Sequence, residues 1–353
     1  MELQGKVKNL KLPAFFPDAT HGTVKSMPTF NLADSATQSV VVNAYHLYVD
    51  DLTDTIQKAG GIHNYANING VVITDSGGFQ VMSLVRRNPK NGKITDEGVK
   101  FVIEGKGSVY VSPEVSIDAQ VKIGSDIVMC FDDCTEPFEP VKQQKLSVNR
   151  TIEWAKRCKK RFIEQTKDLE KKPYLFGIIQ GGDSKELRTL CGEKLNEIGF
   201  DGFAFGGWPV DQNKVLLEEI LQLTANLMPN DKPKYAMGVG KPVDIVKCYK
   251  MGYNMFDCVL PTRDARHERL YVFKSEPTKE SVLSEDFHEY LYIGSGKYSK
   301  DYSPISEYCD CITCKTYSRS YLNHLFKTEP NVASTLATIH NLRFYSRLME
   351  MLQ

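Results

Sequence analysis

The chain has 353 residues, enough for one large α/β barrel or two ordinary domains with a sizeable core. Its 44 Lys and Arg residues balance its 44 Asp and Glu residues, so any nucleic-acid binding must rest on a local basic patch. The opening residues, MELQGKVKNLKL, lack the apolar region of a signal peptide, and no run approaches the roughly 20 apolar residues of a membrane span. We therefore expect a soluble, cytoplasmic protein.

Short runs rich in Val, Ile and Phe recur along the chain, with helical apolar spacing between them. In order they are SVVVNAYHL, VVITDSGG, DIVMCFDDC, YLFGIIQGG, FDGFAFGGW, KYAMGVGK and NMFDCVL. This alternation is typical of a parallel sheet covered on both faces. Because polar or glycine-rich residues end every run, a TIM-type (β/α)8 barrel explains the pattern best. A Rossmann sheet would need an early GxGxxG turn, which the first run lacks.

Two aspartates follow such runs, Asp75 in VVITDSGGFQVMSL and Asp257 in NMFDCVLPTRDAR. Carboxylates there stand at the mouth of a sheet. Glycosidic bond exchange needs two acids, one to attack the sugar and one to move protons. Either aspartate alone could equally be a helix N-cap or a turn former. The position of both aspartates at the end of an apolar run favours a catalytic role.

The segment SVNRTIEWAKRCKKRFIEQ is predicted to be an amphipathic helix. Its apolar side is expected to carry Ile152, Ala155, Phe162 and Ile163. The basic cluster at 156–161 falls on the other side. RNA binding is one reading of this cluster, but a solvated outer face explains it better.

Barrel character ends near residue 275, so we expect a catalytic barrel over 1–275 and a zinc-binding subdomain with a closing helix over 276–353. The expected zinc ligands are a CxCxxC motif and a histidine on the apolar face of the last helix: Cys309, Cys311, Cys314 and His340. Four protein ligands leave no open position for water, so the metal would be structural. The alternative is a packed histidine beside a loose cysteine loop.

The motifs resemble those of the tRNA-guanine transglycosylases, the queuine or prequeuosine tRNA-ribosyltransferases. The matching elements span nearly the whole chain: HGTVKSM at 21–27, NAYHL at 43–47, TDSGGFQVMSL at 74–84, FDDCTEP at 131–137, GIIQGG at 177–182, FGGW at 205–208, MGVGKP at 237–242, MFDCVLPTR at 255–263, and the CxCxxC with its histidine. The family exchanges guanine at the anticodon wobble position, G34, for a 7-deazaguanine base. The resemblance therefore implies a pentosyltransferase.

The resemblance also implies residue roles. Asp257 would be the nucleophile that forms a covalent ribosyl-aspartate, and Asp75 the general acid/base, in a ping-pong reaction. The implied base-binding residues are Phe79, Asp132, Gln180, Gly206, Gly207 and Met237. The two polar side chains would hydrogen-bond the base, the glycines would let backbone approach it, and the two apolar side chains would sandwich its ring.

Three arginines follow the expected nucleophile. We expect Arg263 and Arg266 to contact the anticodon loop, since single-stranded loops are where proteins read RNA bases. Helix-dipole or ion-pair interactions with Asp264 and Glu268 are the alternative, and we prefer it for Arg269. Family members commonly work as homodimers, so a homodimer is expected here.

One segment departs from the typical bacterial pattern. Where such members carry a sequence like GGLAVGE, this chain reads GGWPVDQ, with Trp208, Pro209 and Gln212. Val210 and Cys134 favour prequeuosine as the incoming base, whereas the altered loop leaves room for queuine.

Two rival functions remain open. One is a non-catalytic RNA-binding subunit of a heteromeric transglycosylase, against which the intact Asp75 and Asp257 argue. The other is insertion of the base into DNA, which is distinguished by whether labelled guanine enters tRNA or duplex DNA.

Overall fold

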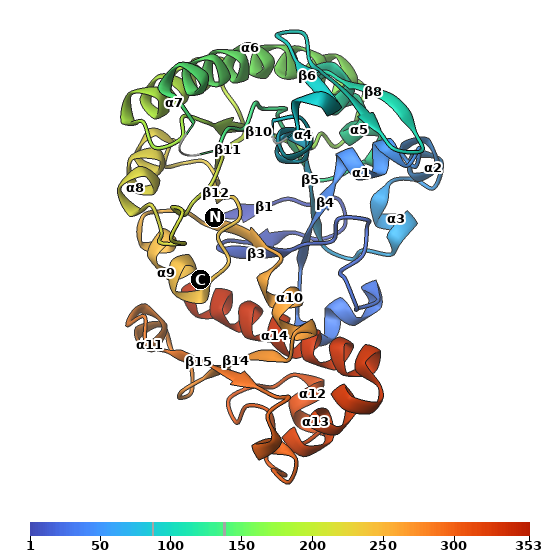
Figure 1. Cartoon of the computed structure of the whole chain (residues 1–353), viewed down its shortest axis with the longest axis vertical. Coiled ribbons are helices and arrows are strands. Elements are labelled where there is room, and N and C mark those ends of the chain that lie inside the picture. Colours follow the sequence, from blue (N-terminus) through green and yellow to red (C-terminus); the bar gives the residue numbers. More distant parts are fainter. Residues whose placement is uncertain (87, 137–138) are drawn as a thin grey trace.

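Eight parallel strands form a nearly closed barrel (Figure 1). The computed structural model describes residues 1–86, 88–136 and 139–353, so Pro137 of the FDDCTEP motif lies outside the described residues. The barrel strands, in order around the barrel, are β3 (Ala14–Pro17), β4 (Ser39–Asn43), β5 (Val71–Asp75), β9 (Ile127–Met129), β10 (Tyr174–Ile179), β11 (Gly202–Phe205), β12 (Lys234–Ala236) and β13 (Met255–Cys258).

Strand β3 closes the barrel. It pairs in parallel with β13, and a bridge between Asp18 and Val41 joins its end to β4. The (β/α)8 barrel predicted from the sequence is confirmed, but β3 was not among the seven predicted runs. Its four residues, AFFP, follow Pro13 and end in Pro17, and they lack the long Val and Ile run that marked the other strands.

Helices cover the outside of the barrel (Figure 1). They are α1 (Ala44–Val49), α2 (Thr53–Lys58), α3 (Ile62–Ala66), α4 (Gly78–Val85), α5 (Pro113–Ile123), α6 (Val141–Thr166), α7 (Lys185–Ile198), α8 (Glu218–Leu227), α9 (Pro242–Lys250) and α10 (Leu260–Arg266). An antiparallel sheet of β6 (Gly92–Ile94), β7 (Val99–Ile103) and β8 (Gly107–Val111) is inserted between β5 and β9. Short 3-10 helices lie at Thr29–Ser35, Pro89–Asn91 and Gly296–Tyr298.

Helix α6 confirms the predicted amphipathic helix with one error. Ile163 is 56% exposed, whereas Phe162 is buried. Consecutive helical residues point about 100° apart, so the two cannot both face the barrel. In the basic cluster, Lys156 and Lys160 are exposed, as expected. Arg157 and Arg161 are partly buried and pair with Glu114 and Asp118.

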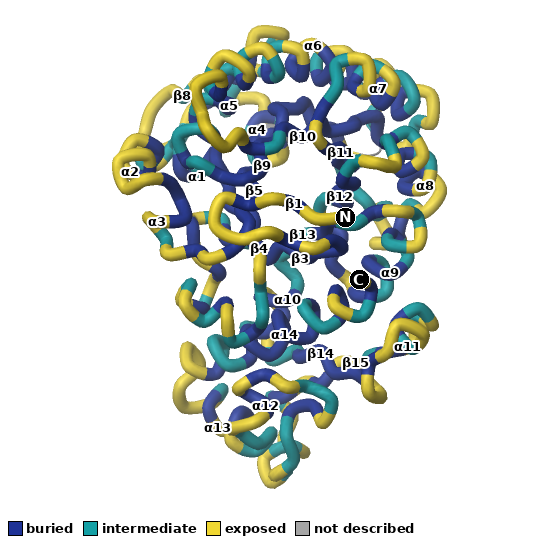
Figure 2. Tube along the Cα trace, turned by 180° about the vertical axis from the view of Figure 1, so that it is seen from behind, coloured by how far each residue is buried: buried dark blue, intermediate teal, exposed yellow. Residues whose placement is uncertain are grey.

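The N-terminal hairpin of β1 (Glu2–Leu3) and β2 (Leu10–Lys11) covers the amino-terminal end of the barrel. Lys6 reaches Asp126 and Gly124, which precede β9, and Leu3 and Leu10 join the apolar core inside the barrel. Figure 2 shows this hairpin crossing the end of the barrel that faces the viewer. The carboxyl ends of the strands are therefore left as the working face.

A second unit lies beneath the barrel (Figure 1). Its elements are β14 (Arg269–Phe273), α11 (Lys279–Leu283), β15 (His288–Tyr292), α12 (Ile312–Thr316), α13 (Arg319–Thr328) and α14 (Pro330–Leu352). Strands β14 and β15 pair in antiparallel register. Helix α14 joins the two units through the buried Asn341, whose amide donates to the carbonyls of Pro261 and Arg269 and whose oxygen accepts from Tyr271 N.

Among the residues that the structure describes, no helix combines the length and the apolar character needed to cross a membrane.

Candidate active site

The alternation of side chains along the strands brings the candidate site residues to the barrel mouth. Ile73 on β5 and Met255 on β13 belong to the core inside the barrel. Side chains two residues apart face the same side of a strand, so Asp75 and Asp257 also point toward the barrel axis. The same step of two from an inward core residue leads to Asn43, Gln180, Gly206 and Met237.

Three aspartates share this mouth, and the pKa of each is raised. Burial raises the pKa of Asp75 to about 7, and the nearby negative charges of Asp132 and Asp257 add to the effect. Burial likewise raises the pKa of Asp132 and that of Asp257 to about 6. Because carboxylates in one poorly solvated site compete to be ionised, near neutral pH they exchange protons rather than all staying charged.

Asp75 is held by a residue that sequence analysis gave no role. Asn43 lies beside it in the β4–β5 register, and its Nδ2 donates to Asp75 Oδ2 at 3.2 Å. The Asn43 oxygen caps α1 by accepting from Tyr45 N and His46 N, so its orientation is fixed. The position of the polar Asn43 at the end of an apolar run was the sequence signal that could have identified it as a site residue.

Asp257 has two donors of its own. The backbone N–H of Gly238 donates to Asp257 Oδ1 at 2.8 Å, and the buried Tyr235 hydroxyl also hydrogen-bonds the carboxylate. Both lower the pKa of Asp257 against the effect of burial, while the negative charge of Asp18 raises it slightly. Tyr235 was missed because a tyrosine inside an apolar strand is normally core.

Asp132 and Gln180 form the floor of the candidate base pocket. Gln180 Nε2 donates to Asp132 Oδ2 at 2.6 Å, and Ser76 Oγ donates to Asp132 Oδ1 at 3.4 Å. A Cβ at Gly206 would lie 2.5 Å from Gln180 Nε2, and one at Gly78 would lie 2.3 Å from Asp132 Oδ1. Glycine at these two positions therefore leaves space for the Gln180 amide and the Asp132 carboxylate.

Asp133, the neighbour of Asp132, is held from the outside of the barrel. Its carboxylate pairs with Arg86 at the end of α4 and with Arg150 on α6. Its backbone N–H donates to Thr151 Oγ1 at 3.1 Å. These contacts fix the loop that carries Asp132 and give Asp133 a structural use.

The apolar candidates lie on different elements. Phe79, on the first turn of α4, is 42% exposed and meets Trp208 with 5.6 Å between ring centroids. Met237 is partly buried against the core inside the barrel. Gly207 has φ +91°, a left-handed conformation that favours glycine.

The three arginines after Asp257 lie in different environments. Arg269 pairs with Asp264 at 2.6 Å, which confirms the ion-pair interpretation. Arg263 is exposed, and Arg266 is partly buried with its NH1 donating to the carbonyl of Thr262. Burial, and to a lesser extent the positive charge of Arg263, lower the pKa of Arg266. RNA contact by these two side chains remains a prediction.

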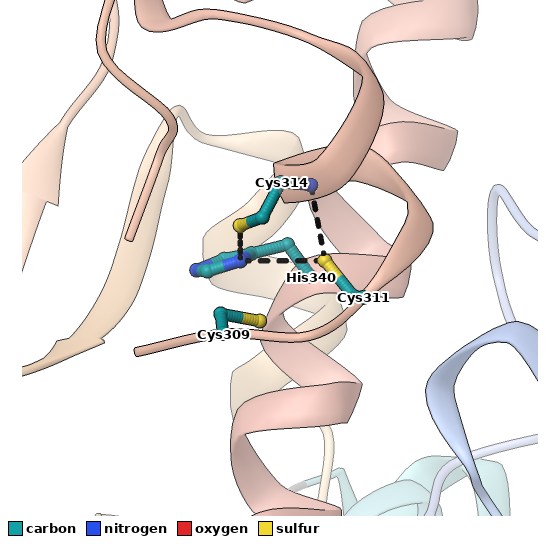
Figure 3. A group of neighbouring side chains, drawn as sticks. All are labelled: Cys309, Cys311, Cys314 and His340. Atoms are coloured by element: carbon teal, nitrogen blue, oxygen red, sulfur yellow. Dashed lines mark hydrogen bonds between the residues drawn. The ribbon is translucent and has the colours of Figure 1, made fainter. Parts of the chain in front are cut away.

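Cys309, Cys311, Cys314 and His340 come together in a cluster that could hold a metal ion (Figure 3). Their ligand atoms all lie within 4.8 Å of one another. His340 Nε2 faces the carbonyl of Tyr271 at 2.8 Å, which leaves Nδ1 toward Cys314 Sγ at 3.2 Å. A histidine oriented in this way through its second nitrogen is typical of metal ligands, so the residues fit a tetrahedral metal site.

Comparisons with known proteins point to one family. A family model described as "Queuine tRNA-ribosyltransferase" matches residues 1–353. Similar curated proteins with the same name occur in Mannheimia succiniciproducens (42% identity, covering 98% of this chain and 86% of the relative) and Baumannia cicadellinicola (43%, 96% and 86%). Another occurs in Francisella tularensis subsp. novicida (42%, 97% and 87%).

Removal of metal from the cysteine cluster should destabilise the second unit. Treatment with a strong chelator is expected to lower the thermal unfolding midpoint by about 5 °C or more, because a closed metal site contributes folding free energy directly. The measurement is calorimetry with metal content determined by mass spectrometry. A Cys311→Ser variant should show no further fall with chelator. Metal-free protein with an unchanged midpoint would contradict the assignment.

The raised pKa of Asp75 should make the fold less stable as pH rises. The group binds a proton more readily when folded, so its stabilising effect is complete below its ordinary value of 3.8 and is lost as pH passes about 7. The Asp75→Asn variant has no carboxyl group at this position and therefore does not lose this stability as pH rises. Its free energy of unfolding, relative to that of wild type, should increase by about 2 to 3 kcal/mol between about pH 5 and about pH 8.

Urea unfolding at the two pH values measures the change. Asp168→Asn is the control, because that side chain is 87% exposed. If the difference in the free energy of unfolding between Asp75→Asn and wild type is the same at both pH values, ionisation of Asp75 does not destabilise the fold.

Proposed function

Because the chain belongs to the queuine tRNA-ribosyltransferase family, we propose that it exchanges guanine 34 of tRNA for a 7-deazaguanine base through a covalent bond to Asp257. The family membership makes the protein a pentosyltransferase that acts on tRNA. One observation carries the finer proposal. Two carboxylates from distant parts of the chain, Asp75 and Asp257, interact electrostatically in one barrel mouth and have different raised pKa values.

The proposed chemistry proceeds in two displacements at the ribose C1′ atom. Asp257, ionised, attacks C1′ and forms an ester-like bond while Asp75, protonated, gives its proton to the leaving guanine. The incoming base then loses a proton to Asp75 and displaces Asp257, so the configuration at C1′ is retained. pKa values of about 6 for Asp257 and about 7 for Asp75 favour this division of roles near neutral pH.

The base would be recognised between the fourth and sixth barrel strands. We propose that Asp132 accepts from the guanine N1 and N2 hydrogens and that Gln180 bonds the other edge, with the Gln180–Asp132 contact opening to admit the base. Gly206 and Gly207 would let the backbone approach the base. Phe79 and Met237 would cover its faces, since a base removed from its stack needs apolar surfaces.

The metal is proposed to be zinc in a structural role. Cys309, Cys311, Cys314 and His340 would hold it, and a site closed by three thiolates and one imidazole offers no position for a reacting water. Its proposed contribution is to fix the cysteine loop against α14, which in turn contacts α10 beside Asp257.

The incoming base is proposed to be prequeuosine, with queuine as the alternative. Val210 and the buried Cys134 favour prequeuosine by the sequence resemblance, and the GGWPVDQ loop leaves room for queuine. A catalytically silent subunit is disfavoured, because such a subunit would have no reason to keep Asp75 and Asp257 in one poorly solvated site.

The proposed assembly is a homodimer in the cytoplasm, where tRNA is modified. Exposed aromatic side chains on and near α13 support a contact surface: Tyr302 is 83% exposed and Tyr321, 44% exposed, stacks on Tyr317. Residues 1–275 are proposed as the catalytic barrel and 276–353 as the zinc-binding subdomain. Strand β14 precedes this boundary but pairs with β15 beyond it.

Replacement of the proposed nucleophile tests the mechanism. Asp257→Ala should abolish both base exchange and the denaturant-stable RNA adduct, because no atom remains to bond C1′. Asp75→Ala should lower kcat by on the order of 10²- to 10⁴-fold, the usual contribution of a general acid/base. Labelled guanine exchange with an anticodon stem-loop, and mass spectrometry of the trapped complex, measure both effects. A fully active Asp257→Ala protein would end the assignment.

Substitution of Arg263 tests the RNA contact. Arg263→Ala should raise KM for the RNA and reduce the salt dependence of binding by about one unit of log–log slope, as expected for one lost phosphate contact. The exchange rate at saturating RNA should be little changed. Lys250→Ala is a control, since its cation already pairs with Glu285. An unchanged salt slope for Arg263→Ala would assign the phosphate contact elsewhere.

A further inference from the structure

One short loop connects the proposed nucleophile to the closing helix of the chain. Residues 237–241 join β12 to α9, and the exposed Gly238 in this loop donates its N–H to Asp257 Oδ1 at 2.8 Å. Gly238 has φ +74°, a left-handed conformation that favours glycine. The position of this donor therefore depends on how the rest of the loop is held.

Two contacts hold the buried end of the loop at Gly240. A Cβ at Gly240 would lie 2.2 Å from the Cβ of Cys258, so the Gly240 backbone lies directly against the residue that follows Asp257. The carbonyl of Gly240 accepts a hydrogen bond from the hydroxyl of Tyr345 at 2.6 Å. Gly240 thus contacts both β13 and helix α14.

Tyr345 is itself fixed by close packing. Its side chain is fully buried, and its ring centroid lies 4.5 Å from that of Phe15 on β3 and 5.3 Å from that of Tyr271 on β14. Helix α14, which lies between the barrel and the second unit in Figure 1, carries this ring. A buried tyrosine hydroxyl needs only some acceptor, but here the acceptor belongs to the loop that donates to Asp257.

We propose that Tyr345 is a positioning residue for the nucleophile: its hydroxyl holds the 237–241 loop so that the Gly238 N–H stays on Asp257. This role rests on the proposed function, in which Asp257 attacks the ribose. A donor to a carboxylate stabilises the ionised form. Loss of the Tyr345 hydroxyl should therefore make Asp257 harder to ionise.

Other polar groups also act on Asp257. The Tyr235 hydroxyl on β12 hydrogen-bonds it, and the negative charges of Asp18, after β3, and Asp75, on β5, interact with it. Substitution of Tyr345 removes none of these groups. A change in the ionisation of Asp257 in such a variant would therefore report on the loop.

The test compares wild type with Tyr345→Phe, which keeps the ring and removes the hydroxyl. The kcat and KM for labelled guanine exchange are measured with one anticodon stem-loop across a range of pH. At about pH 5, Tyr345→Phe should lower kcat/KM about tenfold, the order of one hydrogen bond to a charged group. At about pH 8 the loss should be less than about twofold, because the pKa of Asp257 is about 6 in wild type and the group is ionised in both proteins. KM for the RNA should stay within about twofold of wild type at both pH values, since the loop is not proposed to bind the RNA backbone.

Two further variants accompany this test. Tyr65→Phe is the matched control with a wild-type profile, since that side chain is 43% exposed on α3. Gly240→Ala displaces the same loop from Cys258 and leaves the Tyr345 hydroxyl in place, so it should also lower kcat/KM most at acid pH. Thermal unfolding midpoints establish that each variant is folded at the assay temperature.

An unchanged profile in Tyr345→Phe would overturn the inference. A loss by the same factor at every pH would overturn it as well, because the hydroxyl would then support the fold alone. If Tyr345→Phe does not fold, the Gly240→Ala profile decides in the same way. Each of these results leaves the proposed function intact as long as Asp257→Ala is inactive, whereas a fully active Asp257→Ala protein would overturn both.

Discussion

Closure of a parallel barrel with strictly alternating side chains is the constraint on which the rest of the structure depends. An inward core residue such as Ile73 or Met255 fixes the direction of the residue two positions later, where the strand has run out of apolar neighbours. Polar side chains from distant parts of the sequence, such as Asn43, Asp75 and Asp257, thus converge at the ends of the strands. The hairpin across the opposite end leaves them a single face on which to act.

Convergence has an energetic cost that neighbouring groups partly offset. Gly238 and Tyr235 hydrogen-bond Asp257, Gln180 and Ser76 hydrogen-bond Asp132, and Asn43 and the backbone of Ser76 and Gly77 hydrogen-bond Asp75. Besides burial, the negative charges of Asp132 and Asp257 raise the pKa of Asp75, which is the highest of the three. The surroundings, rather than any difference in residue type, thus distinguish the proposed acid from the proposed nucleophile.

The sequence predicts most of this arrangement because a strand followed by a polar residue leaves a local pattern. That pattern predicts the barrel. The spacing of the cysteines predicts their cluster, and the nearby acidic residues predict the Arg269 ion pair. Strand β3 could not be predicted from the sequence, because the four-residue AFFP segment is recognisable as a strand only through its pairing with β13. Ile163 was misassigned because helix rotation separates it from Phe162. The hydrogen bond from Tyr235 to Asp257 depends on which atoms meet across elements, and no pattern along the sequence predicts it.

The pairing of β3 with β13 also constrains how the molecule is made. Ala14 emerges early in synthesis, yet its partner Met255 follows most of the chain, and the last residue, Gln353, bonds the carbonyls of Lys11 and Pro13 just before β3. The edge of β3 therefore stays without its partner strand until β13 has been made. Such long sequence separation slows folding and lengthens the time during which an unpaired strand edge is exposed to aggregation.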